Sequence, residues 1–244
     1  MFIGVDGCPA GWLAVAFPKL GEPSLAVYPD ADALWRAHSG AEVICIDIPI
    51  GLRDEGDRER VCDLEARRLL GERTSSVFPA PCRDAVSAKS YKQACDINEQ
   101  RTGRRLSKQT WAIVPKIREV DELLLRDEDA RARIREVHPE VCFWALAGGR
   151  PMSYHKSTEQ GYHERANVLE FVHRGAYDII ARGLAEFPRS RVARDDILDA
   201  LAGAVTALVG PNGLATIPET PETDAKNLPM QMVYTSQFLE YEWT

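Results

Sequence analysis

Two aspartates follow apolar runs with the composition of buried strands. Asp6 closes the run FIGVD, and Asp47 lies near the end of VICIDIPIG. If these strands are adjacent and parallel, both carboxylates emerge at the carboxyl end of one sheet, where open α/β sheets bind ligands. Glycine and proline follow closely in both places, so each aspartate also has a structural interpretation as a cap of a turn or helix.

A second acidic pair occurs late in the chain, in ARDDILDALAGAVTALVG. Asp196 and Asp199 are three residues apart, which places them on one side of a helix. The helix is apolar nearly all round, and such helices are buried. A buried carboxylate is costly unless a cation or a donor meets it. The alternative for the start of this helix is that Asp195 or Asp196 is its N-cap.

Four converging carboxylates form a site rich in hard oxygen ligands. Such a site suits Mg²⁺ or Mn²⁺ rather than zinc. Two such ions about 4 Å apart are the apparatus of in-line phosphodiester hydrolysis. We therefore expect a site for two Mg²⁺ or Mn²⁺ ions whose catalytic and metal-binding residues are Asp6, Asp47, Asp196 and Asp199.

The first half of the chain contains the strands that would position these aspartates. Strand patterns at 2–6, 11–17 and 24–28 are joined by short connections, which predicts an antiparallel meander. A helix in PDADALWRAH, capped by one of its aspartates, leads to a strand at 43–48. The continuous apolar run of that strand favours burial on both faces and a parallel neighbour.

The remaining pattern is mostly helical. It predicts an α/β fold with a mixed five-stranded sheet flanked by helices, in a single domain over 1–244. The segment PETPETDAKNLP is expected to be a loop. The other expected elements are a helix from about 57 to 71, a helical insertion at about 72–133, a strand at 134–138, two or three helices in 140–187, and a helix at 195–210.

Composition and charge narrow the function classes. The net charge of −7 provides no global positive field, so any nucleic-acid contact must be local. Six scattered cysteines without a C-x-x-C pair, and no signal or long apolar span, favour a reducing, cytoplasmic setting away from membranes. Phosphate-loop, dinucleotide-binding and nucleophile-elbow motifs are absent from the sequence.

Four blocks carry a family resemblance: VDGCPAGW, IDIPIGL, SSVFPAP and EVHPEVCF. They resemble the DUF429 family of predicted ribonuclease H-like (RNase H-like) nucleases over about 1–210. The segment DILDALA is similar to the last helix of the RuvC-type Holliday junction resolvases. The resemblance implies an RNase H-like fold and a metal-dependent nuclease, with the four aspartates on the superfamily's metal-binding positions.

The block EVHPE holds three further candidates. Glu136, His138 and Glu140 are candidate accessory or phosphate-binding residues of uncertain role. Strand alternation places Glu136 and His138 on one face. The alternative is that this face is the solvent edge of the sheet.

Phosphate contacts are also expected from the segment HKSTEQGYHERAN. Lys156 and Arg165 are available there to hold a phosphate. A helix-capping pattern that starts at Ser157 explains much of the segment without a function.

A local basic cluster in the insertion could track a nucleic-acid backbone, DNA or RNA. The alternative is a solvated helix face with acidic neighbours. The cluster consists of Arg101, Arg104, Arg105 and Lys108, followed by Lys116 and Arg118.

The leading hypothesis is a nuclease or phosphodiesterase that uses two metal ions. One alternative is an ATP-binding phosphotransferase or ATPase of the related actin-like fold, whose first strand also ends in Asp-Gly. Another is a non-catalytic module that binds nucleic acid or protein, because a fold does not fix a function.

Overall fold

A five-stranded mixed sheet, as predicted, runs through the middle of the molecule; its strand order is β3-β2-β1-β4-β5. The computed structural model describes residues 1–238, so the last six residues of the expected domain lie outside it. Antiparallel pairing joins the first three strands, and parallel pairing joins β1, β4 and β5. The strands are β1 (Phe2–Cys8), β2 (Gly11–Phe17), β3 (Ser24–Tyr28), β4 (Val43–Ile46) and β5 (Ile134–Glu136).

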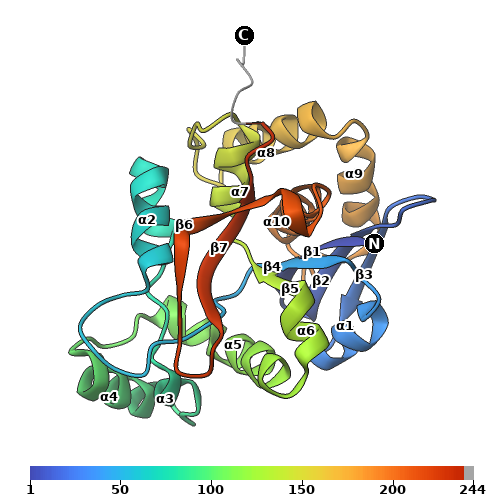
Figure 1. The fold of residues 1–244 in the computed structure, drawn as a ribbon. Helices are drawn as coiled ribbons and strands as arrows, with labels where there is room; N and C mark the ends of the chain where they lie inside the picture. The colour runs from blue at the N-terminus through green and yellow to red at the C-terminus, as the bar shows by residue number, and fades with distance from the viewer. Residues whose placement is uncertain (239–244) are drawn as a thin grey trace.

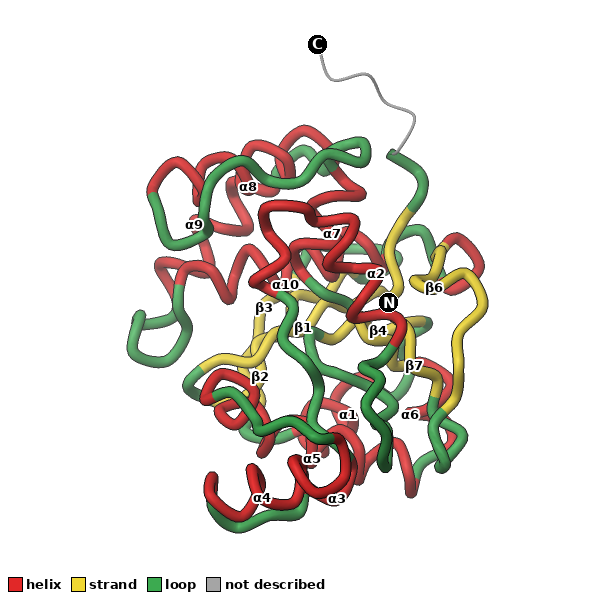
Figure 2. Tube along the Cα trace, turned by 90° about the vertical axis from the view of Figure 1, so that its left-hand side faces the viewer, coloured by secondary structure: helices red, strands yellow, loops and turns green. Residues whose placement is uncertain are grey.

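Helices cover both faces of this sheet and form a three-layer structure (Figure 1). One face packs in a core with α1 (Ala31–His38) and α5 (Lys108–Arg126). Figure 2 shows the strands between this layer and the helices of the opposite face. The opposite core contains α7 (Pro139–Leu146), α8 (Glu159–Val172), α9 (Ala176–Glu186) and α10 (Arg194–Ala207).

The strand β4 is buried on both faces, as its apolar run predicts. Ile44 and Ile46 belong to the core beneath α5, whereas Val43 and Cys45 belong to the core beneath α10. The alternation follows from the two-residue period of a strand. The position of each residue along β4 thus determines which face of the sheet its side chain occupies.

The insertion packs partly on the sheet and partly as a satellite. The helix α5 contributes to the core beneath the sheet, and α3 (Arg83–Val86) and α4 (Tyr91–Thr102) share a smaller core of their own. Asp127 separates the last two helices of the insertion: it ends α5 and caps α6 (Glu128–Arg133). The helix α2 (Val61–Leu70) and the 3₁₀ turn η1 (Gly71–Ser76) precede these elements.

The prediction of a loop over PETPETDAKNLP is wrong for most of this segment. It contains the end of β6 (Leu214–Thr223), which forms a hairpin with β7 (Pro229–Thr235). The register shifts between Ile217 and Glu222, so Pro218 and Pro221 fall where the ladder is interrupted and need no N–H donor, whereas Pro229 is the first residue of β7. Apolar residues of the hairpin pack with α2 and α7, which explains why tertiary contacts override the proline signal. A second 3₁₀ turn, η2 (Pro211–Gly213), precedes the hairpin.

No helix within residues 1–238 has both the length and the apolar character that crossing a membrane requires.

Candidate functional site

The carboxyl ends of β1 and β4 place Asp6 and Asp47 at one edge of the sheet. Parallel pairing ends at Val5 and Ile46, and the backbone N–H of Asp47 then donates to the carbonyl oxygen of Val5 at 2.9 Å. The strand β1 continues to Cys8, two residues beyond its expected end, because its other edge still pairs with β2. Because side chains alternate along a strand, Asp6 lies on the same face of β1 as Gly4 and Cys8, which is the face that α10 covers.

The helix α10 approaches β1 through glycine. A Cβ on Gly4 would lie 2.0 Å from the nitrogen of Ala204 and 2.1 Å from the oxygen of Ala200, so only hydrogen fits between strand and helix. Gly203 faces the strand from the helix side, where a Cβ would lie 3.3 Å from the Cα of Gly4. Asp199 precedes this contact by one residue and is 3% exposed. The glycine contact therefore brings Asp199 to the strand ends.

Asp196 has a structural function as well as a place in the site. Its Oδ2 accepts the backbone N–H of Ala193, the N-cap residue, at 2.7 Å. Neither Asp195 nor Asp196 is the N-cap; Asp196 is the third helical residue and reaches back to the cap. The capping alternative thus explains one of its two oxygens.

Burial raises the pKa of all four aspartates. Burial and then the charges of Asp47, Asp199 and Asp196 raise the pKa of Asp6 well above its ordinary value. Burial also raises the pKa of Asp47. The pKa of Asp196 and that of Asp199 are both raised to about 6, again mainly by burial. The charges of the other three aspartates thus all act on Asp6, although among the described residues no three of the four offer ligand atoms that all lie within 4.8 Å of one another.

Lys156 supplies the cation that meets this cluster. Its Nζ donates to Asp199 Oδ2 at 2.8 Å and lies 3.5 Å from Asp195 Oδ2. The charge of Asp199 is the main cause that raises the pKa of Lys156, so the ammonium stays protonated. About two-fifths of the side chain remains exposed, which leaves it accessible to an anion.

Arg165, the other expected phosphate ligand, is buried and already bonded. Its Nε and Nη2 donate to Glu140 Oε1 at 3.1 and 2.6 Å, and its Nη1 donates to the carbonyl oxygens of Tyr154 and Gly161. The side chain is 1% exposed. In this arrangement Arg165 anchors Glu140 and the segment before α8.

Glu136 lies in a buried ion-pair cluster instead of at a solvent edge. It is 3% exposed, and Arg60 donates to both of its oxygens at 2.8 Å. Arg60 also donates to both oxygens of Asp63, at 3.1 and 2.6 Å. Cys62, Asp63 and Glu136 offer ligand atoms that all lie within 4.8 Å of one another, so this group could bind a metal. A cation there would have to displace the Arg60 guanidinium.

His138 lines the same cavity as Asp47. Its Nε2 lies 3.2 Å from the carbonyl oxygen of Ser76, a residue of the SSVFPAP block. The block therefore contributes a backbone contact that holds this ring.

The site opens into a cavity of about 420 Å³. Asp6 and Asp47 line it together with Lys156, whereas its apolar wall includes Phe78, which is 39% exposed. Pockets of this size accept small organic ligands. The other lining residues that bear on the site are Glu136, His138, Glu140, His155 and Arg165.

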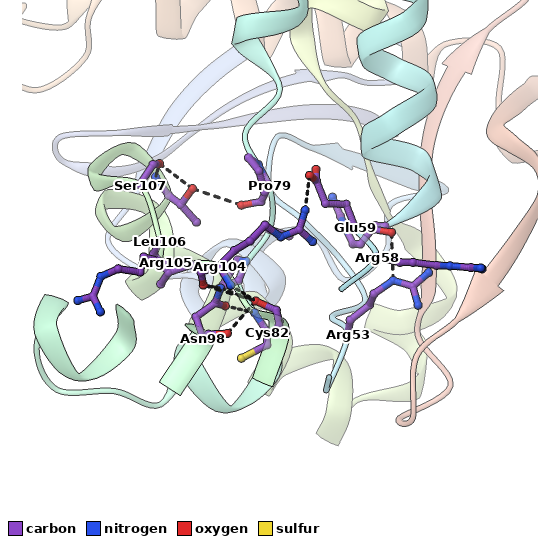
Figure 3. A pocket seen from close by; sticks show the side chains of 15 residues that line it. Arg53, Arg58, Glu59, Pro79, Cys82, Asn98, Arg104, Arg105, Leu106 and Ser107 are labelled. Atoms are coloured by element: carbon purple, nitrogen blue, oxygen red, sulfur yellow. Dashed lines mark hydrogen bonds and ion pairs between the residues drawn. The ribbon is translucent and has the colours of Figure 1, made fainter. Parts of the chain in front are cut away.

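The basic cluster of the insertion is largely paired with acids. Arg104 donates to Glu59 at 2.6 Å, as Figure 3 shows, and Arg105 turns away from the pocket drawn there. Arg105 is bonded to acids of α4, and Arg101 to Asp84 at 2.6 Å. For these three arginines the arrangement corresponds to the solvated face with acidic neighbours. Lys116 lies over the ring of Trp12 and lines the cavity that contains Asp6, and Arg118 donates to carbonyl oxygens.

Sequence reasoning missed the residues that support the site. Arg60 and Asp63 lie in a charged stretch whose spacing fits any exposed helix, so no signal marks them as buried. The contact from Ser76 to His138 uses a main-chain oxygen, which no side-chain pattern reveals.

Residues 4–223 match the family model described as "Protein of unknown function (DUF429)". The matched range contains every candidate site residue and ends with the last residue of β6. None of the curated proteins matches the chain, and none of the solved structures does.

Proposed function

Since this chain belongs to the DUF429 family, whose model spans residues 4–223, we propose from its own site that it is a metal-dependent phosphodiesterase of the RNase H-like class. One observation carries the proposal: Asp6 and Asp47 lie at the carboxyl ends of two adjacent parallel strands and line one cavity with Lys156, which donates to Asp199. A nuclease acting on DNA or RNA is the specific form of this activity that the family resemblance favours.

The chemistry of these side chains fits hard divalent cations. One ammonium faces several buried carboxylates, which leaves excess negative charge, and buried charge needs compensation. Among the described residues, Asp199 Oδ1 is a buried oxygen without a hydrogen-bond partner. Mg²⁺ or Mn²⁺ would be held by the four aspartates. When bound, a pair of such ions polarises a phosphoryl oxygen and activates water.

The protein's own groups would orient the substrate. Lys156 has the exposure and the charge to hold a non-bridging phosphate oxygen beside Asp199. The apolar wall that includes Phe78 would exclude water from the group attached to the phosphate. A terminal or unpaired nucleotide matches the cavity better than a continuous duplex, because the cavity volume is about 420 Å³.

The setting we propose is the cytoplasm. All six cysteines lie among the described residues and are free and buried. Free thiols persist in a reducing compartment.

The test is hydrolysis of single-stranded, duplex and branched nucleic acids and of a small phosphodiester, with Mg²⁺ or Mn²⁺. Asp6→Asn should abolish the metal-dependent activity, because it removes a central carboxylate charge. Asp178→Asn is the matched control, since Asp178 is exposed on α9 and lies outside the cavity lining. Equal activity of Asp6→Asn and wild type would refute the proposal.

A further inference from the structure

The turn from β5 into α7 carries further candidate metal-ligand atoms besides those of the four aspartates. His138 ends the extended stretch after β5, and Glu140 lies in the first turn of α7. Both residues line the cavity that holds Asp6 and Asp47. Each has one atom committed to a protein partner and a second atom without one.

The hydrogen bond of His138 fixes its tautomer. The carbonyl oxygen of Ser76 can only accept, so Nε2, 3.2 Å away, must carry the proton. In the neutral ring Nδ1 is then an acceptor with a free lone pair. This Nδ1 is buried and has no partner within the described part of the chain. Metal-binding histidines commonly show this arrangement, with the second ring N–H donated to a backbone carbonyl.

Glu140 presents a similar division between its two oxygens. Both hydrogen bonds that Arg165 makes to Glu140 go to Oε1, at 3.1 and 2.6 Å. Oε2 is buried and, in residues 1–238, meets no donor. The residue is 5% exposed, so solvent does not readily supply the missing partner. A buried carboxylate oxygen without a donor calls for a cation.

Asp199, on α10, completes the pattern. Lys156 binds its Oδ2, which leaves Oδ1 as the unpartnered oxygen among the residues described. Lys156 lines the same cavity as Asp47, His138 and Glu140, so the three unpartnered atoms belong to residues at or next to one cavity.

We propose that His138 Nδ1 and Glu140 Oε2 join Asp47 and Asp199 Oδ1 as ligands of one divalent cation. This inference rests on the proposed function and extends its metal site. The imidazole nitrogen makes the site mixed in character, which favours a transition ion such as Mn²⁺ over Mg²⁺. Lys156 can keep its bond to Asp199 Oδ2 while the ion binds Oδ1. Among the described residues, the ligand atoms of Cys62, Asp63 and Glu136 form the one group whose members all lie within 4.8 Å of one another. No three of the donors proposed here lie that close together, so the ion must draw them together.

The test is pulsed electron paramagnetic resonance of Mn²⁺ bound to the purified full chain. We expect electron spin echo modulation from a directly coordinated ¹⁴N in the wild type. His138→Gln should remove the modulation and weaken Mn²⁺ binding about tenfold or more, with little change in Mg²⁺ binding. His155→Gln is the matched control, because His155 lines the same cavity but is exposed, and the modulation should persist.

A second variant tests the carboxylate. Glu140→Gln keeps an acceptor for Arg165 while removing the charge, so the fold is retained and Mn²⁺ affinity falls. Circular dichroism checks the fold of each variant. If a variant fails to fold, the electron spin echo modulation of the wild-type protein still tests the inference.

The outcomes separate this inference from the proposed function. Bound Mn²⁺ without nitrogen modulation, or no Mn²⁺ binding, overturns the inference. If Mn²⁺ binds without nitrogen modulation, but the protein hydrolyses a phosphodiester and Asp6→Asn abolishes that activity, the proposed function survives. Nitrogen-coordinated Mn²⁺ that depends on His138, in a protein that cleaves no phosphodiester, supports the inference and refutes the proposed function.

Discussion

The contact between β1 and α10 predicts a large effect from the smallest substitution, Gly4→Ala. The new Cβ would lie 2.0 Å from the nitrogen of Ala204, and ordinary contacts begin near 3.4 Å, so α10 must move by about 1.4 Å. Overpacking of this kind costs about 1–3 kcal/mol. For a chain of this size the melting temperature falls by about 2–4 °C per kcal/mol, and thus by about 2–12 °C.

The same shift carries Asp199 away from Asp6. A displacement of about 1 Å in catalytic groups can reduce a rate about 100-fold. Scanning calorimetry would measure the melting temperature, and titration calorimetry with Mn²⁺ would measure metal affinity. Gly40→Ala is the matched control, because a Cβ there meets nothing within 4 Å. A Gly4→Ala protein that melts with the wild type and binds Mn²⁺ equally well would refute this account of how the site is held.

The remaining predictions concern charge and the cavity wall. Because the pKa of Asp196 and that of Asp199 are raised to about 6, their contribution to stability is present near pH 4 and is lost as pH rises through 6; denaturant titrations across this range check the sign. Mn²⁺ affinity should change oppositely and weaken below about pH 6, as calorimetry at stepped pH would detect. Lys156→Met should lower stability by about 1.5 kcal/mol and tighten Mn²⁺ binding, since the repulsion between the ammonium and the ion is gone; unchanged values of both would contradict its role. Arg60→Met should cost about 3–5 kcal/mol in chemical denaturation by leaving two buried carboxylates unpaired, and a neutral result would argue against the cluster. On nucleotide substrates, Phe78→Ala should raise KM roughly 5- to 150-fold through lost base stacking with kcat little changed, whereas a fall in kcat alone would exclude stacking.

Local patterns were sufficient to predict the sheet and the main helices around it. The apolar run of β4 required burial on both faces and parallel neighbours, and the pairing with β1 and β5 confirms this. The hairpin β6–β7 escaped prediction because its prolines signal a loop locally, whereas packing against α2 and α7 holds the strands together.

The candidate site divides in the same way. Its carboxylates were predictable because an acidic residue at the end of a buried strand, or within an apolar helix, violates the surrounding pattern. The partners of Glu136 and Arg165 were not, because their ion pairs join segments that are distant in the sequence.

The sequence by itself determined which side chains could do chemistry and on which elements they lie. Only the tertiary structure decided which of their atoms are already bonded to other protein groups and which are left for a ligand. Arg165 resembles a phosphate ligand in the sequence, yet its guanidinium is buried against Glu140. The physical reason is that strand and helix periods are set locally, whereas the partner of each buried polar atom depends on which distant segments pack against it.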